Sequence, residues 1–368
     1  MRILFSAVPA YGHVLPIMAM ARAAMSAGHE VSLLTHGAMS ELADPVPVLA
    51  AGPTFAELSA AYSAGKPGPR TGVRTPEDVA EFFVSTRVTA TLDPASRAAA
   101  AYQPNLLIAE AADEVGPLVA AQLGKWAQHS LGMAIARDFA AATAAAASRF
   151  CEPRGLHRPE RIAYLDICPV ALQAEDWEPP ADRIAVRPLP FDRDTSWVPP
   201  AFNDPANPTV LVTLGTMLDD IPLLRETLEG LAAARVNVLV TSMRGRPAPL
   251  PSQSRGRAHD IGFVPLARVL PLVDAVVCAG GMGTVLAVLA SGLPFVGMPR
   301  FPSQQWITKR AADLGAGVVV DGPEGVPRAV LWLLSDDRHR RGAATASAML
   351  AEMAEPSEAL TRLLKLLL

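Results

Sequence analysis

The sequence predicts an α/β protein built from two doubly wound parallel sheets. Short apolar runs typical of buried strands alternate with longer segments of helical periodicity, which is the pattern of parallel sheets covered by helices. This pattern occurs once before and once after a proline-rich segment near the middle of the chain. The length of 368 residues also exceeds the usual size of a single domain. We therefore expect two Rossmann-like domains.

Eight runs are predicted to be strands, four in each half of the chain. They are RILFSAV (2–8), EVSLLTH (30–36), NLLIAEA (105–111), IAYLDIC (162–168), TVLVTLG (209–215), VNVLVTS (236–242), AVVCAGG (275–281) and PFVGMP (294–299). The alanine-rich segment 138–150 is predicted to be a helix, because alanine is the best helix former. Segment 61–78 mixes Gly, Pro and Ser without periodicity, so it is predicted to be a loop that walls the first domain's binding site.

Prolines separate the two halves. Segment 191–208 is rich in proline, which fixes φ and removes backbone donors, so neither a helix nor a sheet continues through it. We place the first domain at residues 1–192, a linker at 193–208 and the second domain at 209–355. The remaining segment, 356–368, has leucines at helical spacing and is predicted to be a final helix.

Composition excludes several classes of function. The formal net charge of −4 provides no general basic field for nucleic acid, and no apolar window is long enough for a membrane span. Cys151, Cys168 and Cys278 are too few and too scattered for a disulfide framework or a zinc cluster. We expect a cytoplasmic protein that acts on small molecules.

Two glycine turns in the second half have the character of anion sites. TLGTM (213–217) and CAGGMGTVLAVLASG (278–292) each follow a predicted strand and lead into a helix. Glycines let backbone amides approach a phosphate, and the helix dipole favours negative charge at that end. A pyrophosphate suits both turns. The alternative is that the glycines only make tight turns, since neither segment matches a Walker or a complete G-x-G-x-x-G motif.

Five motifs occur in a fixed order along the chain: GHVLP (12–16), LDICPVALQ (165–173), VTLGT (212–216), GFVPLARVLPLVDAVVCAGGMGT (262–284) and SGLPFVGMPRFPSQQ (291–305). This ordered set resembles the GT-B glycosyltransferases, closest to the actinobacterial enzymes that glycosylate polyketides, macrolides and enediynes. The resemblance runs nearly end to end. It implies two domains that face each other across a ligand-binding cleft, with the final helix packed back on the first domain.

The resemblance implies that His13 is the general base that takes the proton of the acceptor hydroxyl. A histidine titrates near neutral pH and would stand at the carboxyl end of the first strand, which suits this role. The family's aspartate that orients the histidine corresponds to Glu110. The alternatives are a turn histidine without catalytic role and a surface carboxylate.

The resemblance also implies a donor site in the second domain, where Phe263 stacks on the base and the main chain of Val264 meets the base edge. Four of the family's polar contacts are replaced, by Leu266, Ala279, Ala287 and Ser303. These losses favour a deoxysugar, which has fewer hydroxyls to hold. The full predicted donor set is Gly215, Thr216, Phe263, Val264, Ala279, Gly280, Gly281, Met282, Gly283, Thr284, Arg300, Ser303 and Gln304.

Together these features predict an inverting, metal-independent glycosyltransferase that moves a deoxysugar from a dTDP- or UDP-sugar to a natural-product aglycone. The acceptor pocket is expected within residues 55–90 and 130–150, whose sequence does not identify the aglycone. The partners are a nucleotide sugar and a hydrophobic acceptor, in a monomer or homodimer. Two alternatives remain: a catalytically degenerate homologue that assists another glycosyltransferase, and a GT-B sugar-nucleotide epimerase.

Overall fold

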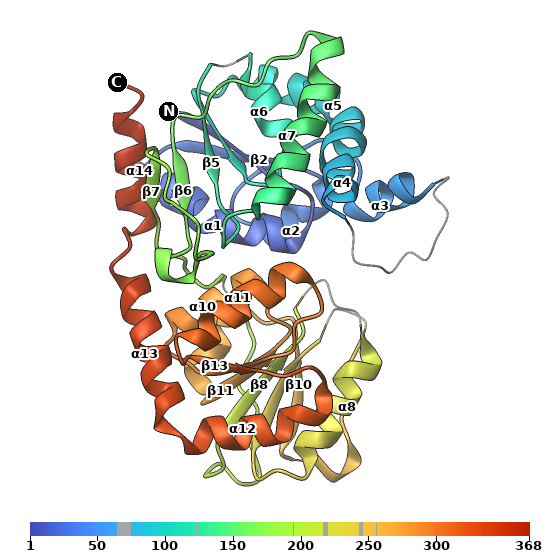
Figure 1. Ribbon diagram of the computed structural model, residues 1–368, viewed down its shortest axis with the longest axis vertical. Coiled ribbons are helices and arrows are strands. Elements are labelled where there is room, and N and C mark those ends of the chain that lie inside the picture. Colours follow the sequence, from blue (N-terminus) through green and yellow to red (C-terminus); the bar gives the residue numbers. More distant parts are fainter. Residues whose placement is uncertain (65–74, 123, 194, 216–219, 243–245, 255) are drawn as a thin grey trace. The chain divides into compact units, whose positions relative to one another are not determined.

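The computed structural model describes residues 1–64, 75–122, 124–193, 195–215, 220–242, 246–254 and 256–368. The chain forms two compact α/β units (Figure 1). Unit 1 comprises Met1–Ile167, Trp177–Val186 and Ala354–Leu368, and unit 2 comprises Cys168–Asp176 and Arg187–Met353. Residues 168–176 and 187–192, which the sequence analysis placed in the first domain, therefore lie in unit 2.

Unit 1 contains a seven-stranded parallel sheet in the order β3-β2-β1-β4-β5-β6-β7. The strands are β1 (Arg2–Ser6), β2 (Glu30–Thr35), β3 (Val48–Ala50), β4 (Leu106–Glu110), β5 (Trp126–His129), β6 (Tyr164–Asp166) and β7 (Arg183–Ala185). The order reverses at β1 and β4, and this switch point is where open α/β sheets bind ligands. Successive residues Ile3 and Leu4 are both fully buried, so helices cover both faces of the sheet.

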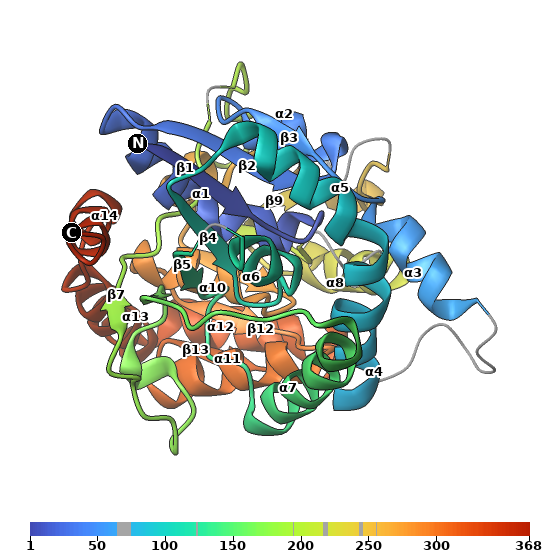
Figure 2. The ribbon, with the colours of Figure 1, turned by 90° about the horizontal axis from the view of Figure 1, so that it is seen from above.

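The helices of unit 1 are α1 (Tyr11–Ser26), α2 (Ser40–Ala43), α3 (Phe55–Ser63), α4 (Pro76–Ala80), α5 (Arg87–Tyr102), α6 (Val115–Ala120), α7 (Arg137–Cys151) and α14 (Pro356–Lys365). A π-helical segment, Glu81–Thr86, joins α4 to α5. Helix α6 lies over β4 (Figure 2). Helix α14 lies beside β7 in Figure 1 and also contacts α1, so the last helix packs within unit 1.

Unit 2 contains a six-stranded parallel sheet in the order β10-β9-β8-β11-β12-β13. The strands are β8 (Thr209–Thr213), β9 (Asn237–Thr241), β10 (Ala258–Gly262), β11 (Ala275–Cys278), β12 (Phe295–Gly297) and β13 (Gly317–Val319). The helices are α8 (Ile221–Ala232), α9 (Leu266–Val269), α10 (Met282–Ala290), α11 (Pro302–Asp313), α12 (Val326–Ser335) and α13 (Asp337–Ala351). Leucines of α8 pack with apolar residues of α12 against β8 and β9.

The α/β class and all eight predicted strands are confirmed. The loop predicted at 61–78 is wrong at both ends, because residues 61–63 belong to α3 and 76–78 to α4. Each of these helices has a capping box, with Thr54 or Thr75 as its N-cap. Residues 65–74 of that prediction lie outside the described residues. No helix in the described part of the chain combines the length and apolarity that crossing a bilayer requires.

Candidate active site

His13 and Glu110 lie together at the carboxyl edge of the unit 1 sheet. His13 is on the first turn of α1, which begins shortly after β1 ends, and Glu110 is the last residue of the neighbouring strand β4. Strands β1 and β4 are parallel and in register, with Ser6 beside Ala109. Nδ1 of His13 is 2.9 Å from Oε1 of Glu110. The two residues that the resemblance paired are thus brought into contact.

The surroundings of Glu110 fix the tautomer of His13. The Glu110 side chain is fully buried, and it accepts hydrogen bonds from the backbone N–H of Val8 at 3.2 Å and of Ala112 at 2.6 Å. A carboxylate only accepts, so Nδ1 of His13 donates to it and Nε2 holds the lone pair. The His13 side chain is 19% exposed. The pair therefore presents a partly accessible base whose orientation is held by a buried carboxylate.

Aromatic side chains border His13 on one side. The ring of Phe83, in the π-helical segment, lies 5.7 Å from the imidazole between centroids. Phe83 meets Phe82 edge-on, and Phe82 contacts Phe55 and Tyr62. Sequence reasoning placed the acceptor pocket in this region but missed Phe83 itself. Only spatial contact distinguishes it from other core aromatics.

Two further acidic residues follow Glu110 and were missed by sequence reasoning. Asp113 is buried and paired with Arg87, and Glu114 pairs with Arg158 at 2.7 Å. Burial raises the pKa of Glu114, and the neighbouring Asp113 and Glu110 charges raise it further against the opposing effect of Arg158. The signal in the sequence was three carboxylates within five residues, of which the first ends a buried strand and the other two follow it.

In unit 2, the two glycine turns follow neighbouring strands β8 and β11. Gly215 and Gly280 both have φ of +76°. A Cβ on Gly280 would lie 2.4 Å from Cγ2 of Thr308, so this position requires glycine. Gly281 is the N-cap of the nine-residue helix α10, and Gly283 is exposed in its first turn. Thr216 lies outside the described residues.

The predicted base-binding residues follow β10. Val264 is buried and Phe263 is half-buried. The carboxylate of Asp260 accepts from Ser242 Oγ at 2.7 Å, from the Ala248 N–H at 2.7 Å and from the Gly262 N–H at 2.9 Å. Asp260, which sequence reasoning did not select, thus ties the exit of β9 to the residues just before Phe263.

The other predicted donor residues differ in their exposure. Ala279 and Ala287 are buried, and Ala279 belongs to the apolar core, so neither methyl group is available as a ligand contact. Arg300 and Ser303 are exposed. Oε1 of Gln304 accepts from the backbone N–H of Arg300 at 2.8 Å and of Phe301 at 3.2 Å, which caps α11. Gln304 therefore has only its amide nitrogen left for a ligand.

Met282 and Thr284 complete the predicted set, on the first turn of α10, where both are partly exposed. Among the described residues, no group of three or more His, Cys, Asp or Glu side chains is arranged to hold a metal ion. The backbone N–H groups in the first turn of α10 have no carbonyl partner within the helix, and they give this end of the helix a partial positive charge.

Comparison with known proteins identifies the family. Residues 225–366 match the C-terminal domain of erythromycin biosynthesis protein CIII-like proteins. The chain is 27% identical to elloramycin glycosyltransferase ElmGT of Streptomyces olivaceus, over 99% of this chain and 97% of that protein. It is also 27% identical to L-demethylnoviosyl transferase of Streptomyces niveus, over 86% of this chain and 84% of that protein.

Solved structures agree over the whole chain. Glycosyltransferase SsfS6 from a Streptomyces species, complexed with thymidine diphosphate, has a TM-score of 0.84 and 25% identity, with 99% of each chain covered. SnogD from Streptomyces nogalater has a TM-score of 0.81 and 25% identity, over 100% of this chain and 99% of that one. The chain is a glycosyltransferase with the GT-B fold, similar to glycosyltransferases of natural-product biosynthesis.

The whole-chain likeness to these structures assigns the two units to the two domains of the GT-B fold. The family match in unit 2 spans both α10, with its glycine turn, and α11. Unit 1 contains the His13–Glu110 pair in the segment that the full-length relatives also cover. Ala279 and Ala287 stand at positions where the motif resemblance predicts polar contacts to the donor, and both are buried.

Proposed function

We propose that this glycosyltransferase transfers a deoxysugar from a dTDP- or UDP-sugar to a hydroxyl of a natural-product aglycone, with inversion at the anomeric carbon. The observation that carries the proposal is the His13–Glu110 hydrogen bond at the switch point of the unit 1 sheet. It provides a base with a defined tautomer where ligands of α/β sheets bind. Relatives named as glycosyltransferases of antibiotic pathways support the chemistry.

The reaction follows from the roles of these groups. Nε2 of His13 takes the proton of the acceptor hydroxyl while its oxygen attacks the anomeric carbon of the sugar. The bond from that carbon to the diphosphate oxygen breaks, and the electron pair leaves with the nucleoside diphosphate. One direct displacement inverts the anomeric centre. Glu110 holds the His13 ring and stabilises the imidazolium that forms.

The leaving diphosphate is assigned to the start of α10. The backbone N–H groups there and the positive end of the helix dipole stabilise the charge that develops on the leaving oxygen. No metal is required in this proposal. Ser303 stands where the resemblance puts an acidic residue that holds sugar hydroxyls, which favours a sugar with fewer hydroxyls. A structural relative solved with thymidine diphosphate supports a dTDP-linked donor.

The test has two parts. Melting temperature is measured against dTDP, UDP, their sugars and the corresponding nucleosides, because a ligand that binds only the folded state raises apparent stability. The diphosphates should shift it and the nucleosides should not. The protein is then incubated with dTDP- or UDP-deoxysugars and a panel of polyketide aglycones, and glycosides are detected by mass. No shift with any diphosphate would contradict the donor assignment.

A second candidate is a catalytically degenerate homologue that assists another glycosyltransferase. The buried alanines at positions 279 and 287 favour it, because they supply no polar contact to the donor. It predicts no glycoside with any donor–acceptor pair unless a second glycosyltransferase is added. The retained His13–Glu110 pair favours the enzyme, since a binding partner needs no base.

A further inference from the structure

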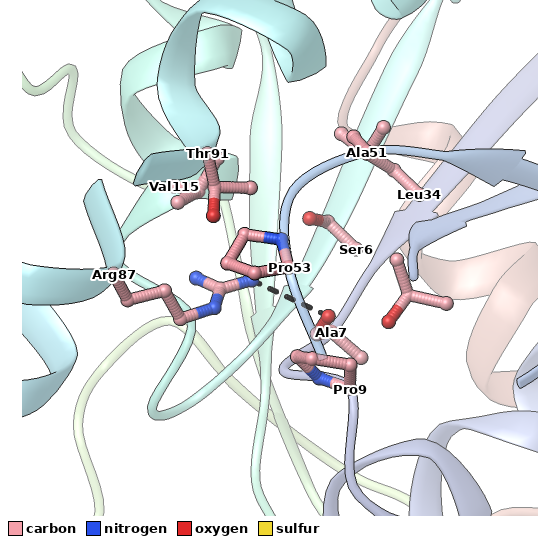
Figure 3. A pocket seen from close by; sticks show the side chains of 10 residues that line it. Ser6, Ala7, Pro9, Leu34, Ala51, Pro53, Arg87, Thr91 and Val115 are labelled. Carbon is pink, nitrogen blue, oxygen red and sulfur yellow. Dashed lines mark hydrogen bonds between the residues drawn. The ribbon is translucent and has the colours of Figure 1, made fainter. Parts of the chain in front are cut away.

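The loop between β1 and α1, which leads into His13, is held by charged groups buried beneath it. The backbone N–H of Val8 donates to Glu110 at 3.2 Å. The carbonyl of the preceding residue, Ala7, accepts from Nη2 of Arg87 at 3.3 Å (Figure 3). Two successive residues of the loop are therefore held by charged groups, Ala7 by a guanidinium and Val8 by a carboxylate.

Arg87 is in turn fixed by Asp113. Nη1 of Arg87 donates to Oδ1 of Asp113, and Ser6 Oγ donates to Oδ2. Oδ1 also accepts from the N–H of Val115 at 2.9 Å and of Gly116 at 3.3 Å, at the start of α6. Both charged side chains are almost completely buried. A buried ion pair of this kind is poor evidence for added stability, but it specifies one arrangement of the groups around it.

Arg87 also continues the element that contacts the His13 ring. The π-helical segment 81–86 ends immediately before Arg87, and it carries Phe83 against the imidazole. One helical element thus contacts both the ring and the loop that supports it. π-Helical turns within α-helices are frequent at functional sites.

The adjoining cavity does not provide a second ligand site. Its lining includes Ser6, Ala7 and Arg87 (Figure 3), together with Thr35, and its volume is about 10 Å³. That is room for about one water molecule, whereas small-molecule pockets measure hundreds of cubic ångströms. Arg87 Nε and Thr35 Oγ1 are buried without a partner among the described residues. The charged cluster is therefore suited to support rather than to bind a substrate.

We propose that Arg87 and Asp113 are positioning residues for glycosyl transfer: they fix the loop of residues 7–10 so that His13 stays aligned with the acceptor hydroxyl. The inference rests on the proposed function of His13. A reacting group that is misplaced by about 1 Å can lose about a hundredfold in rate. Loosening the loop should therefore lower kcat and leave donor binding, which is assigned to unit 2, unchanged.

The test is a double-mutant cycle with His13. The variant Arg87→Met with Asp113→Asn removes both charges together, because removing one alone would leave an unpaired buried charge. The matched control is Arg158→Met with Glu114→Gln, which removes the neighbouring ion pair that does not contact the loop. Each pair of substitutions is made in the parent protein and in His13→Ala, and kcat and the KM for the nucleotide sugar are measured for every variant.

We expect the Arg87/Asp113 variant to lower kcat about ten- to a hundredfold, with the donor KM within about twofold. The control should keep kcat within about twofold. In the His13→Ala background the Arg87/Asp113 changes should have no further effect, since there is no base left to position. Arg87→Lys, whose ammonium cannot replace both contacts of the guanidinium fork, should give an intermediate kcat.

Three results would overturn the proposal. Equal losses of kcat with and without His13 would show that the cluster has a general structural role. An unchanged kcat in Arg87→Lys would show that the contacts of Arg87 with Asp113 and with the Ala7 carbonyl are not both needed. This test can be read even if the double variant fails to fold. Parental turnover in His13→Ala would reject the role of His13, and with it both this inference and the proposed function.

Discussion

Nδ1 of His13 and Oε1 of Glu110 are 2.9 Å apart, although 97 residues separate them in the chain. The carboxylate is fully buried and held by two backbone N–H groups. Nδ1 of the imidazole therefore donates to Glu110, which leaves Nε2 to act as the base. The orientation of the His13 ring therefore depends on Glu110.

Glu110→Gln should lower kcat by about two orders of magnitude or more, because an amide no longer selects the tautomer or stabilises the imidazolium. Folding should be retained, since glutamine keeps the shape and one acceptor oxygen. Glu114→Gln is the control, because Glu114 pairs with Arg158 and not with His13. Steady-state kinetics give kcat for both variants. Equal kcat values would show that Glu110 has no role in catalysis.

Gly280→Ala should destabilise unit 2 and weaken nucleotide binding. The positive φ disfavours any L side chain, and the new methyl would clash with Thr308. A cost of about 2 kcal/mol or more in unfolding free energy is expected. Gly283→Ala is the matched control for stability alone, because its Cβ meets nothing within 4 Å and it lies in a helix. Urea unfolding compares the two variants, and titration calorimetry compares dTDP binding by Gly280→Ala and the parent; equal unfolding free energies of the two variants would show that the turn tolerates a side chain at Gly280.

Phe83→Ala should raise the KM for the acceptor about five- to tenfold and leave the dissociation constant for dTDP unchanged. The reason is that Phe83 contacts the His13 ring and supplies apolar surface beside it. Trp332→Ala, an exposed aromatic on α12 of unit 2, serves as the control. An unchanged acceptor KM in Phe83→Ala would move the acceptor site away from the π-helical segment.

Much of the architecture follows from the sequence, because strands buried on both faces are continuous apolar runs. Five of the described strands were missed. β3, β7 and β13 have three residues each, β5 (WAQH) contains a glutamine and a histidine, and β10 contains a histidine, an aspartate and a glycine. Their pairing with neighbours, rather than their own composition, makes them strands. Some residues of the candidate site could likewise be predicted from the sequence, and others could not. His13 and Glu110 came from motif resemblance, whereas nothing local links Arg87 to Asp113.

Acidification should destabilise the protein through His129. Its ring is fully buried, with Nδ1 2.7 Å from the carbonyl of Ser130, and desolvation lowers its pKa from 6.5 to about 4. Between these values the unfolded chain binds a proton that the folded protein does not, so stability falls as the pH drops from about 6.5 to 4. At pH 5 the free energy of unfolding is lower by about 2 kcal/mol than at neutral pH on account of His129.

The comparison uses His129→Gln, which has no titrating ring. Urea unfolding of both proteins at pH 7.5 and 5.0 should show that the parent loses about 2 kcal/mol more than the variant over this interval. Because the carboxylates titrate in both proteins, their contribution cancels in the difference. Equal losses would show that His129 is not held neutral in the folded state.

The most direct test of the central claim is the turnover of His13→Ala with an acceptor whose glycosylated group is an aliphatic hydroxyl, which does not ionise unaided. kcat should fall by about two to four orders of magnitude, the usual contribution of a positioned general base. The dissociation constant for dTDP, measured on the same preparation, should stay within about twofold of the parent value. Near-parental turnover in a variant that still binds dTDP would contradict the account.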